Sequence, residues 1–387
     1  MGSRRVKLGI IANEFFDASI STMGGFGWAA RQVARCFTDD PSLGVDVTLI
    51  SGLSPKPGSP SEARSHGVPI IFRDPSRLGV LRRMRSRRFD LLLTIDYRPT
   101  YRAYLEALPR TPIVVWVRDP RPPEDWAEIA SLRIPGANGA VPSGIQPIDC
   151  HSLAGIVRWS RLLRRHLRFA TPAPHLVAKM EATYGTAPAE VALLPNPIAL
   201  DPGVITKSEH PRVVFLGRLD PIKRPWLFFE LARDFPGVEF VVLGQAHFDG
   251  DGAWTPRAIP PNVRAFGHLD GAAKTETLAS AWVLVNTSIH EALAVSFLEG
   301  LRCETPLLAL QDPGGLVSRF GIFAGECGGT GLDALPRLSA GLHRLLADRD
   351  LRGRLGGEGR RWVAQTHGGL HFLAAFRELS GGLGVRW

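Results

Sequence analysis

Short apolar runs of strand length alternate along the chain with stretches that carry apolar residues at helical spacing. This alternation predicts an α/β fold built on mostly parallel sheets. The predicted strands are residues 6–12, 45–50, 70–72, 91–95, 113–117, 191–194, 213–216, 240–244, 262–267, 282–285, 307–310 and 321–324. The predicted helices are residues 29–37, 78–89, 156–169, 174–180, 295–303, 335–347, 351–365 and 369–379.

The alternation of strands and helices runs through the chain twice. A length of 387 residues is sufficient for two domains of ordinary size. A polar stretch at residues 201–211 separates the two halves and has the composition of a linker. We therefore predict a first domain at residues 1–200 and a second at residues 201–365.

The composition, with 44% hydrophobic and 21% charged residues, is that of a globular protein. No apolar run approaches the ~18–20 residues of a membrane-spanning helix. The N-terminus is basic and then briefly apolar, and it runs into Asn13 and Glu14, which favours a strand over a signal peptide. The cysteines show no C-x-x-C spacing, which argues against structural zinc and disulfides and for a reducing cytosol. They are Cys36, Cys150, Cys303 and Cys327.

The formal net charge is +9, mostly from arginine. A basic surface attracts nucleic acid, anionic lipid or phosphorylated substrates, and charge alone does not separate these partners. The chain has no recognisable nucleic-acid-binding motif, so we expect no nucleic acid partner. Residues 78–89 and 156–169 combine arginines with apolar residues and could lie on an anionic membrane. The alternative is that both are ordinary helices with solvated arginine faces.

A strand, a short loop and a helix follow one another at residues 282–303. In an open α/β sheet such a junction points at the ligand crevice beyond the carboxyl end of the strand. A helix that begins near Val295 offers its free N–H groups and positive dipole end to an anion there. Glu291 in the loop and Glu299 in the helix can face the same pocket, and carboxylates accept hydrogen bonds from neutral hydroxyls. A pocket of this kind fits a nucleotide sugar.

A second cluster of polar residues follows the predicted strand at residues 213–216. Gly217 allows the backbone to turn tightly, and Arg218 and Lys223 place two cations where the strand opens into a loop. Two fixed cations can hold a diphosphate and neutralise the charge that it gains on departure.

These motifs resemble those of the retaining glycosyltransferases of family 4, also called glycosyl transferases group 1. Glu291 and Glu299 match the E-x7-E signature of the family, and Gly217, Arg218 and Lys223 match its G-R-x-x-x-x-K element. The glycine-rich stretch at residues 24–27, the P-N-P-I stretch at residues 195–198 and the strand at residues 262–267 also look like elements of the family. The alternative for residues 24–27 is a flexible loop that caps a helix.

The resemblance implies a GT-B fold, in which two Rossmann-like doubly wound domains face a central cleft. It also implies that a C-terminal helix, residues 366–387, crosses back to the first domain. The expected reaction transfers a sugar from a nucleotide-diphosphate sugar, with UDP or GDP favoured, to a glycan, lipid-linked or small-molecule acceptor. Neither a metal nor another cofactor is expected, because the fixed cations replace the metal. The resemblance implies donor-binding roles for Gly25, Gly217, Arg218, Lys223, Ala292, Leu293, Ala294, Ser296 and Glu299, and catalytic roles for Arg218, Lys223, Glu291 and Asp119.

The chain departs from the family at Arg118, where many members have a histidine before the aspartate that matches Asp119. An arginine cannot act as a base, so Arg118 could only bind an anion or orient a substrate. Asp119 remains as a titratable candidate, or it caps the proline-rich turn. The departure leaves open an inactive or nucleotide-sugar-sensing module as the alternative function.

Two further expectations concern metal and location. Asp249 and Asp251 form an Asp-x-Asp sequence, which we interpret as a surface loop and not as a metal site, because no nucleotide-binding segment precedes it. The expected location is cytoplasmic, with peripheral contact with the inner face of the plasma membrane as an open alternative to a soluble enzyme.

Overall fold

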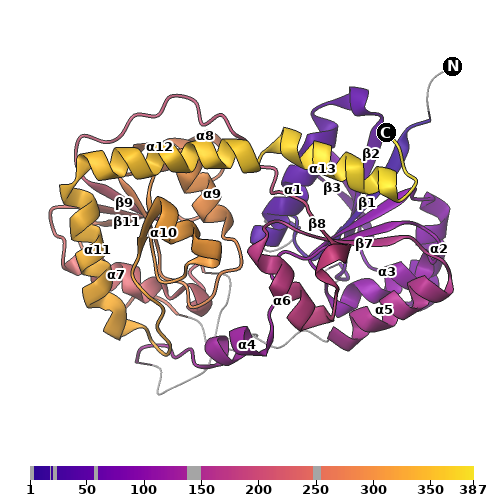
Figure 1. The fold of residues 1–387 in the computed structure, drawn as a ribbon, viewed down its shortest axis with the longest axis horizontal. Helices are drawn as coiled ribbons and strands as arrows, with labels where there is room; N and C mark the ends of the chain where they lie inside the picture. Colours follow the sequence, from indigo (N-terminus) through magenta and orange to yellow (C-terminus); the bar gives the residue numbers. More distant parts are fainter. Residues whose placement is uncertain (1–3, 18, 21–23, 56–59, 137–149, 247–253) are drawn as a thin grey trace. The chain divides into compact units, whose positions relative to one another are not determined.

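The computed structural model describes residues 4–17, 19–20, 24–55, 60–136, 150–246 and 254–387. They form two compact units, the first a mostly parallel sheet and the second a parallel sheet, each covered by helices (Figure 1). The first unit contains the described residues of Met1–Pro122, Pro147–Ile198 and His367–Trp387, and the second contains those of Pro123–Gln146 and Ala199–Thr366. Residues 249–251, with the Asp-x-Asp sequence, lie outside the described residues.

The first unit is built on a sheet with the strand order β3-β4-β2-β1-β5-β6-β7-β8. All described pairings in it are parallel except that of β3 with β4. The antiparallel edge strand β3 is absent from the predicted set, because its E-A-R-S sequence has no apolar pattern. The strands are β1 (Val6–Ala12), β2 (Val45–Ser51), β3 (Glu62–Ser65), β4 (Val68–Ile71), β5 (Leu91–Ile95), β6 (Ile113–Trp116), β7 (Leu167–Thr171) and β8 (Val191–Leu193).

Helices cover both faces of this sheet, and the last helix of the chain is one of them (Figure 1). Phe376 lies edge-on to Phe37 with ring centroids 5.8 Å apart, and Phe372 lies 5.8 Å from Trp116. These aromatic contacts fix the C-terminal helix on the first unit, as the predicted fold class requires. The helices are α1 (Gly25–Thr38), α2 (Arg77–Arg87), α3 (Arg102–Ala107), α5 (Cys150–Leu162), α6 (His175–Tyr184) and α13 (Gly369–Gly382).

The second unit is built on a parallel sheet with the order β11-β10-β9-β12-β13-β14. Its strands are β9 (Arg212–Leu216), β10 (Glu239–Leu243), β11 (Val263–Ala265), β12 (Val283–Asn286), β13 (Leu307–Ala309) and β14 (Gly321–Phe323). Its helices are α4 (Pro123–Ala130), α7 (Pro225–Arg233), α8 (Gly271–Ser280), α9 (Val295–Arg302), α10 (Leu316–Phe320), α11 (Leu335–Ala347) and α12 (Arg349–Thr366).

The strand order reverses direction once in each unit, and each reversal marks a ligand site in folds of this class. In the first unit β1 lies between β2 and β5, and in the second β9 lies between β10 and β12. The loops that follow β9 and β12 therefore leave the sheet side by side. These two loops carry the motifs that the sequence singles out.

Residues 156–169, predicted as one helix, are a helix followed by a strand. Helix α5 ends at Leu162, Arg164 adopts a positive φ of 53°, and β7 begins at Leu167. The side chain of Arg165 is buried and donates to the carbonyls of Leu105 and Thr111, at 2.9 Å in each case. The chain therefore turns sharply before β7, which pairs with both β6 and β8.

One segment departs from the predicted division of the chain, and the predicted linker belongs to the second unit, as the predicted bounds of the second domain imply. Residues 123–136 lie within the predicted first domain but group with the second unit, because Leu132 and Ile134 are buried in its core. The predicted linker at residues 201–211 is packed against the second unit. Lys207 in it donates from Nζ to the carbonyl of Ala281 at 2.8 Å and to Oγ1 of Thr305 at 2.9 Å.

Within the described part of the chain, no helix combines the length and the apolar character needed to cross a membrane.

Candidate active site

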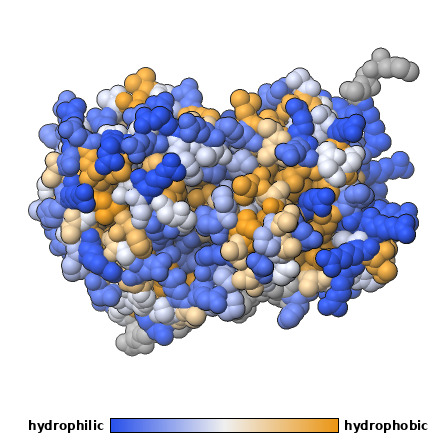
Figure 2. All heavy atoms as spheres, viewed as in Figure 1, coloured by the Kyte–Doolittle hydropathy of each residue, from blue (hydrophilic) through white to orange (hydrophobic). Residues whose placement is uncertain are grey.

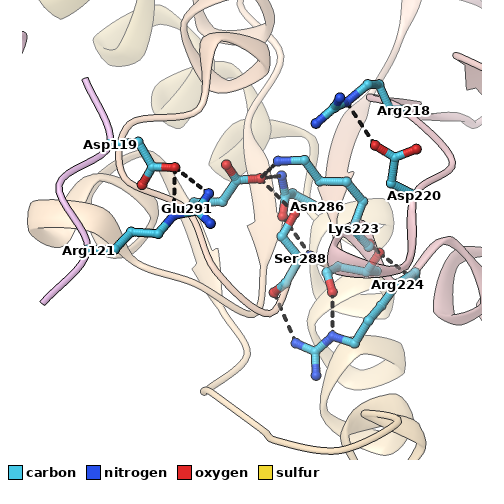
Figure 3. A network of polar contacts seen from close by, with 10 residues as sticks. Asp119, Arg121, Arg218, Asp220, Lys223, Arg224, Asn286, Ser288 and Glu291 are labelled. Carbon is cyan, nitrogen blue, oxygen red and sulfur yellow. Dashed lines mark hydrogen bonds and ion pairs between the residues drawn. The ribbon is translucent and has the colours of Figure 1, made fainter. Parts of the chain in front are cut away.

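The loops after β9 and β12 are joined by hydrogen bonds between their backbones and short side chains (Figure 3). The N–H of Ile289 donates to the carbonyl of Ile222 at 3.0 Å. The hydroxyl of Thr287 donates to the carbonyls of Lys223 and Arg224, at 2.7 and 3.0 Å. The two loops therefore act as one structure at the carboxyl ends of adjacent strands.

Arg224 supplies the strongest connection between these loops. Its side chain is fully buried, and its backbone is in the left-handed region with a φ of 44°. Its guanidinium donates to the carbonyls of Thr287 at 2.9 Å, Ser288 at 3.0 Å and Cys327 at 2.7 Å. Sequence reasoning missed this role, because Arg224 follows Lys223 and looks like another exposed cation of the loop.

The loops bring Lys223 and Glu291 into direct contact. Lys223 Nζ lies 2.6 Å from Oε1 of Glu291. The same oxygen accepts from Nδ2 of Asn286 at 2.9 Å and from the hydroxyl of Ser288 at 2.6 Å (Figure 3). Lys223, which was predicted to bind the diphosphate, and Glu291, which was predicted to bind the sugar, are thus neighbours. One oxygen of the Glu291 carboxylate accepts three hydrogen bonds.

The surroundings of Glu291 keep its carboxylate ionised. Burial raises the pKa of Glu291, but the charge of Lys223 and the hydrogen bonds from Lys223, Ser288 and Asn286 lower this pKa by more. The net result is a pKa below the ordinary value, so Glu291 is negative at neutral pH.

Arg218 lies at the end of β9, where its Nε is 2.9 Å from Oδ2 of the buried Asp220 (Figure 3). Its side chain is 31% exposed, so the cation remains open to solvent. Gly217 does not adopt a positive φ, and a Cβ there would only touch the ring of Phe215 at 3.6 Å. The prediction that a tight turn requires glycine at residue 217 is therefore wrong. The close approach is made by Gly244, where a Cβ would lie 1.8 Å from the carbonyl oxygen of Gly217.

Helix α9 begins directly after the loop of Glu291, and its N-cap residue Ala294 provides no side-chain cap. The N–H groups at such a helix start attract anions. Ala292, Leu293 and Ala294 lead into this turn and are buried, and Ser296 is half-buried within it. This geometry fits the expected anion-binding role of the segment.

Glu299 lies on the same helix and is also paired with a lysine. Its Oε1 is 2.7 Å from Nζ of Lys274 on α8, and this ammonium lies 3.8 Å from Asp270. Both Glu299 and Lys274 are buried. Lys274 was not singled out from the sequence, because its helix α8 was not predicted.

Arg118 in the first unit forms hydrogen bonds with other residues of the protein. Its side chain is buried, and it donates to the carbonyl of Gly25 at 3.0 Å and to Oδ1 of Asn196 at 2.5 Å. Burial lowers the pKa of Arg118 to about 10, which still leaves it charged at neutral pH. Arg118 thus fastens the start of α1 to the strand ends, a role beyond the two that the sequence suggested.

Gly25 begins helix α1, close to the carboxylate of Glu14. The N–H of Gly27 lies 3.4 Å from Oε2 of Glu14, and a Cβ at Gly24 would approach this oxygen to 2.1 Å. A phosphate at this helix start would meet a negative side chain already there. The donor-binding role of Gly25 stays a prediction.

Two carboxylates lie near the strand ends of the first unit. Asp119 forms an ion pair with Arg121, whose Nε is 2.9 Å from Oδ2 (Figure 3). Asp96 directly follows β5, is fully buried and accepts from the N–H of Arg118 at 3.2 Å. Burial raises the pKa of Asp96 to about 6, although Arg98 lowers it in part. Asp96 was not singled out from the sequence, and the catalytic role of Asp119 stays a prediction.

Among the described residues, no group of three or more His, Cys, Asp and Glu side chains is arranged to hold a metal ion.

Comparisons with known proteins support the interpretation of the second unit. Residues 201–362 match the model of the family described as glycosyl transferases group 1. A search of curated protein sequences finds no match.

Solved structures resemble the whole chain. Sucrose-phosphate synthase from Thermosynechococcus elongatus has a TM-score of 0.69 at 15% identity, over 98% of this chain and 100% of that one. HepE from Anabaena, in complex with UDP and glucose, has a TM-score of 0.68 at 13% identity, over 97% and 100% of the two chains. WaaG, a glycosyltransferase involved in lipopolysaccharide biosynthesis, has a TM-score of 0.61 at 14% identity, over 96% and 98%.

These likenesses confirm the predicted fold class, two Rossmann-like α/β domains with parallel sheets as in GT-B glycosyltransferases. The fold and the family match together support a glycosyltransferase, and they locate the glycosyl transferases group 1 domain in the second unit.

Proposed function

We propose, on the premise that residues 201–362 form a glycosyl transferases group 1 domain, that this chain transfers a sugar from a nucleoside diphosphate sugar to an acceptor hydroxyl. We further propose that the configuration at the anomeric carbon is retained. The observation that carries this proposal is the contact of 2.6 Å between Lys223 and Glu291 where the strand order reverses. It joins a cation suited to a diphosphate with a carboxylate suited to sugar hydroxyls.

The reaction needs no protein nucleophile. The bond between the anomeric carbon and the diphosphate oxygen breaks, and the acceptor oxygen forms a bond to the same face of that carbon. The acceptor proton passes to the departing diphosphate oxygen. Arg218, Lys223 and the N–H groups at the start of α9 stabilise the charge that the diphosphate gains, which is where fixed dipoles and cations contribute most to catalysis.

The two glutamates have separate roles in this proposal. Glu291 is ionised, so it accepts hydrogen bonds from the donor sugar and stabilises positive charge that develops at the anomeric carbon. Glu299 accepts from the ribose hydroxyls, and the ion pair with Lys274 holds its carboxylate in place. Asp119 and Gly25 belong to the first unit. We propose that Asp119 acts on the acceptor side and that Gly25 lies near the donor.

We favour a uridine nucleotide as the donor base, with guanosine as the second choice. HepE shares the fold and was solved in complex with UDP and glucose, and this supports the choice of uridine. We also propose that the reaction is independent of metal, since Arg218 and Lys223 can neutralise the diphosphate. Addition of EDTA to a metal-free assay is expected to leave the rate unchanged.

The acceptor is a hydroxyl group on a glycan, a lipid-linked sugar or a small molecule, and the proposed location is the cytoplasm. An inactive or nucleotide-sensing module was suggested by Arg118. The buried bonds of Arg118 to Gly25 and Asn196 weaken that suggestion, because they give the arginine a structural reason to be there.

The experiment is to incubate the protein with UDP-, GDP-, ADP- and TDP-sugars and to measure release of the nucleoside diphosphate. Proton NMR of the released or transferred sugar gives the anomeric configuration. We expect one donor to be consumed and its configuration to be retained. Inversion would contradict the proposed mechanism, and binding of a nucleotide sugar without any turnover would favour the sensing module.

A further inference from the structure

The end of helix α5 carries a cluster of exposed apolar side chains. Trp159, Leu162 and Leu163 are 52%, 74% and 39% exposed. Positions three and four apart lie on one face of a helix, so the three side chains point the same way. Leu153 and Ile156, earlier on the helix, are buried in the core of the first unit. The apolar side chains of α5 therefore continue from the core to the solvent at the end of the helix.

This clustering is unusual for the molecule. Among the described residues, eleven large hydrophobic side chains are exposed, and three of them lie within five consecutive positions. Single exposed hydrophobic residues need no explanation, whereas a contiguous group marks an interaction surface. The space-filling view shows hydrophobic side chains among strongly hydrophilic ones on the surface of the first unit (Figure 2).

Arginines alternate with the apolar residues of this cluster along the sequence. Arg158, Arg161 and Arg164 are exposed, and Cys150–Leu162 contains no acidic residue. Arg165, by contrast, is buried and donates to backbone carbonyls of the segment around α3. These hydrogen bonds fix the end of α5 on the first unit, and the exposed side chains next to Arg165 are therefore held in place.

Helix α2 also carries exposed arginines, and α3 packs against both α2 and α5. Arg82 and Arg85 on α2 are exposed, and Arg77–Arg87 also contains no acidic residue. Other arginines of α2 serve the fold: Arg83 donates to the carbonyl of Phe72 at 3.0 Å, and Arg87 pairs with Glu62. The arginine-rich sequence thus divides into structural and exposed members.

We propose that Trp159, Leu162 and Leu163, with the arginines around them, dock the first unit on an anionic lipid bilayer. The apolar side chains would enter the boundary between headgroups and acyl chains, and the arginines would contact anionic headgroups. A bilayer fits this surface better than an acidic protein, because large exposed apolar side chains accompany the arginines. The proposal does not depend on the transfer reaction.

The test is flotation of the full chain with vesicles of phosphatidylcholine, with and without phosphatidylglycerol. We expect binding only to the anionic vesicles, and we expect salt to weaken it because exposed charges are screened. The single variants Arg158→Gln, Arg161→Gln and Arg164→Gln each remove one positive charge. Each should lower the partition coefficient between water and anionic vesicles roughly fivefold. The triple variant Trp159→Ser, Leu162→Ser, Leu163→Ser should lose binding.

The matched controls are Arg354→Gln and Arg361→Gln, exposed on α12, and Leu370→Ser, exposed on α13. They should bind vesicles like the wild type. Thermal unfolding and sugar-nucleotide turnover without vesicles should be unchanged in all variants, which separates this test from that of the transferase. Absence of flotation with anionic vesicles at low salt would overturn the proposal and leave the surface to an acidic protein. Equal flotation of the triple serine variant would overturn it as well.

Discussion

Glu291 in the second unit and Asp96 in the first are both carboxylates near the carboxyl ends of strands, with side chains only 8% and 1% exposed. Their pKa values nevertheless move in opposite directions, although burial opposes ionisation in both. Oε1 of Glu291 receives donors from Lys223, Asn286 and Ser288, and its pKa falls. Asp96 receives one backbone N–H on Oδ1, and no hydrogen bond to its Oδ2 is formed among the described residues. Its pKa rises to about 6.

The difference shows that the polar neighbours, more than burial, decide whether a carboxylate stays charged. Around Glu291 the second unit has assembled a lysine, an amide and a hydroxyl on a single oxygen. Such an arrangement is costly to bury and is typical of a site that must stabilise charge during a reaction. The strand ends of the first unit lack this concentration of donors on Asp96.

The largest effect is expected from Arg224→Met, which removes the connection between the two loops that hold Glu291. The carbonyls of Thr287, Ser288 and Cys327 would stay buried without their donor. We expect a loss of about 3–5 kcal/mol in the free energy of unfolding of the second unit, as for other broken buried networks. Urea unfolding measures it, and Arg361→Met at an exposed position on α12 is the control, with a loss below about 1 kcal/mol. Equal losses in the two variants would show that Arg224 does not join the loops.

Lys223→Ala removes the charge that holds the pKa of Glu291 down. We expect turnover to fall ~10²- to 10³-fold, on the scale of losing one transition-state charge contact. The pKa of Glu291 should also rise, so the acid limb of the pH–rate profile should move to higher pH. Initial rates across the pH range check both effects, with Lys179→Ala on α6 as the matched lysine control. Wild-type turnover in Lys223→Ala would disprove the assignment of the clamp.

Glu291→Gln and Glu299→Gln separate the two glutamates of the motif. Glu291→Gln should lower kcat about 10- to 100-fold and leave affinity for the free nucleotide unchanged, because its partner is the sugar. Glu299→Gln should weaken the binding of the free nucleotide by a similar factor, since its partner is ribose. Calorimetric titration and steady-state kinetics distinguish these outcomes. Equal loss of nucleotide affinity in both variants would show that both glutamates face the nucleotide.

The smallest effect concerns Asp96. The pKa of Asp96 is raised in the folded state, so its contribution to the free energy of unfolding is most favourable below the ordinary pKa of 3.8. This contribution is lost as the pH rises through about 6. Asp96→Asn keeps the acceptor for the N–H of Arg118 and removes the titration. The variant should gain roughly 1–2 kcal/mol relative to the wild type between pH 5 and pH 8. Urea unfolding at both pH values tests this, and a constant difference would contradict the raised pKa.

The sequence predicted most of the fold where the local pattern and the tertiary structure agree. The buried strands Val6–Ala12 and Leu91–Ile95 and the helix Leu335–Ala347 were predicted to the residue, because their apolar patterns have clear ends. Strand β7 was missed, since Leu167 and Phe169 continue the helical spacing of α5. Its identity as a strand depends on pairing with β6 and β8, which local spacing does not encode.

The candidate site was predictable only in part. The motifs identified Lys223 and Glu291 in loops that follow strands and Glu299 in the next helix, and the structure brings the first two together. The lysine partner of Glu299 and the connection made by Arg224 were not visible. Both depend on burial by distant segments, such as the loop of Cys327, which lies 103 residues after Arg224. A charged residue in the sequence does not reveal whether it will be buried.

Binding of free nucleotides to the second unit tests the proposed donor site without knowledge of the acceptor. Thermal unfolding would be followed with UDP, GDP, ADP and TDP for the wild type, Lys223→Ala and Lys179→Ala, because a ligand of the folded state raises the melting temperature by mass action. We predict that one nucleotide, with UDP favoured, stabilises the wild type and Lys179→Ala and stabilises Lys223→Ala much less. Absence of stabilisation by every nucleotide, or equal stabilisation of Lys223→Ala, would contradict the account.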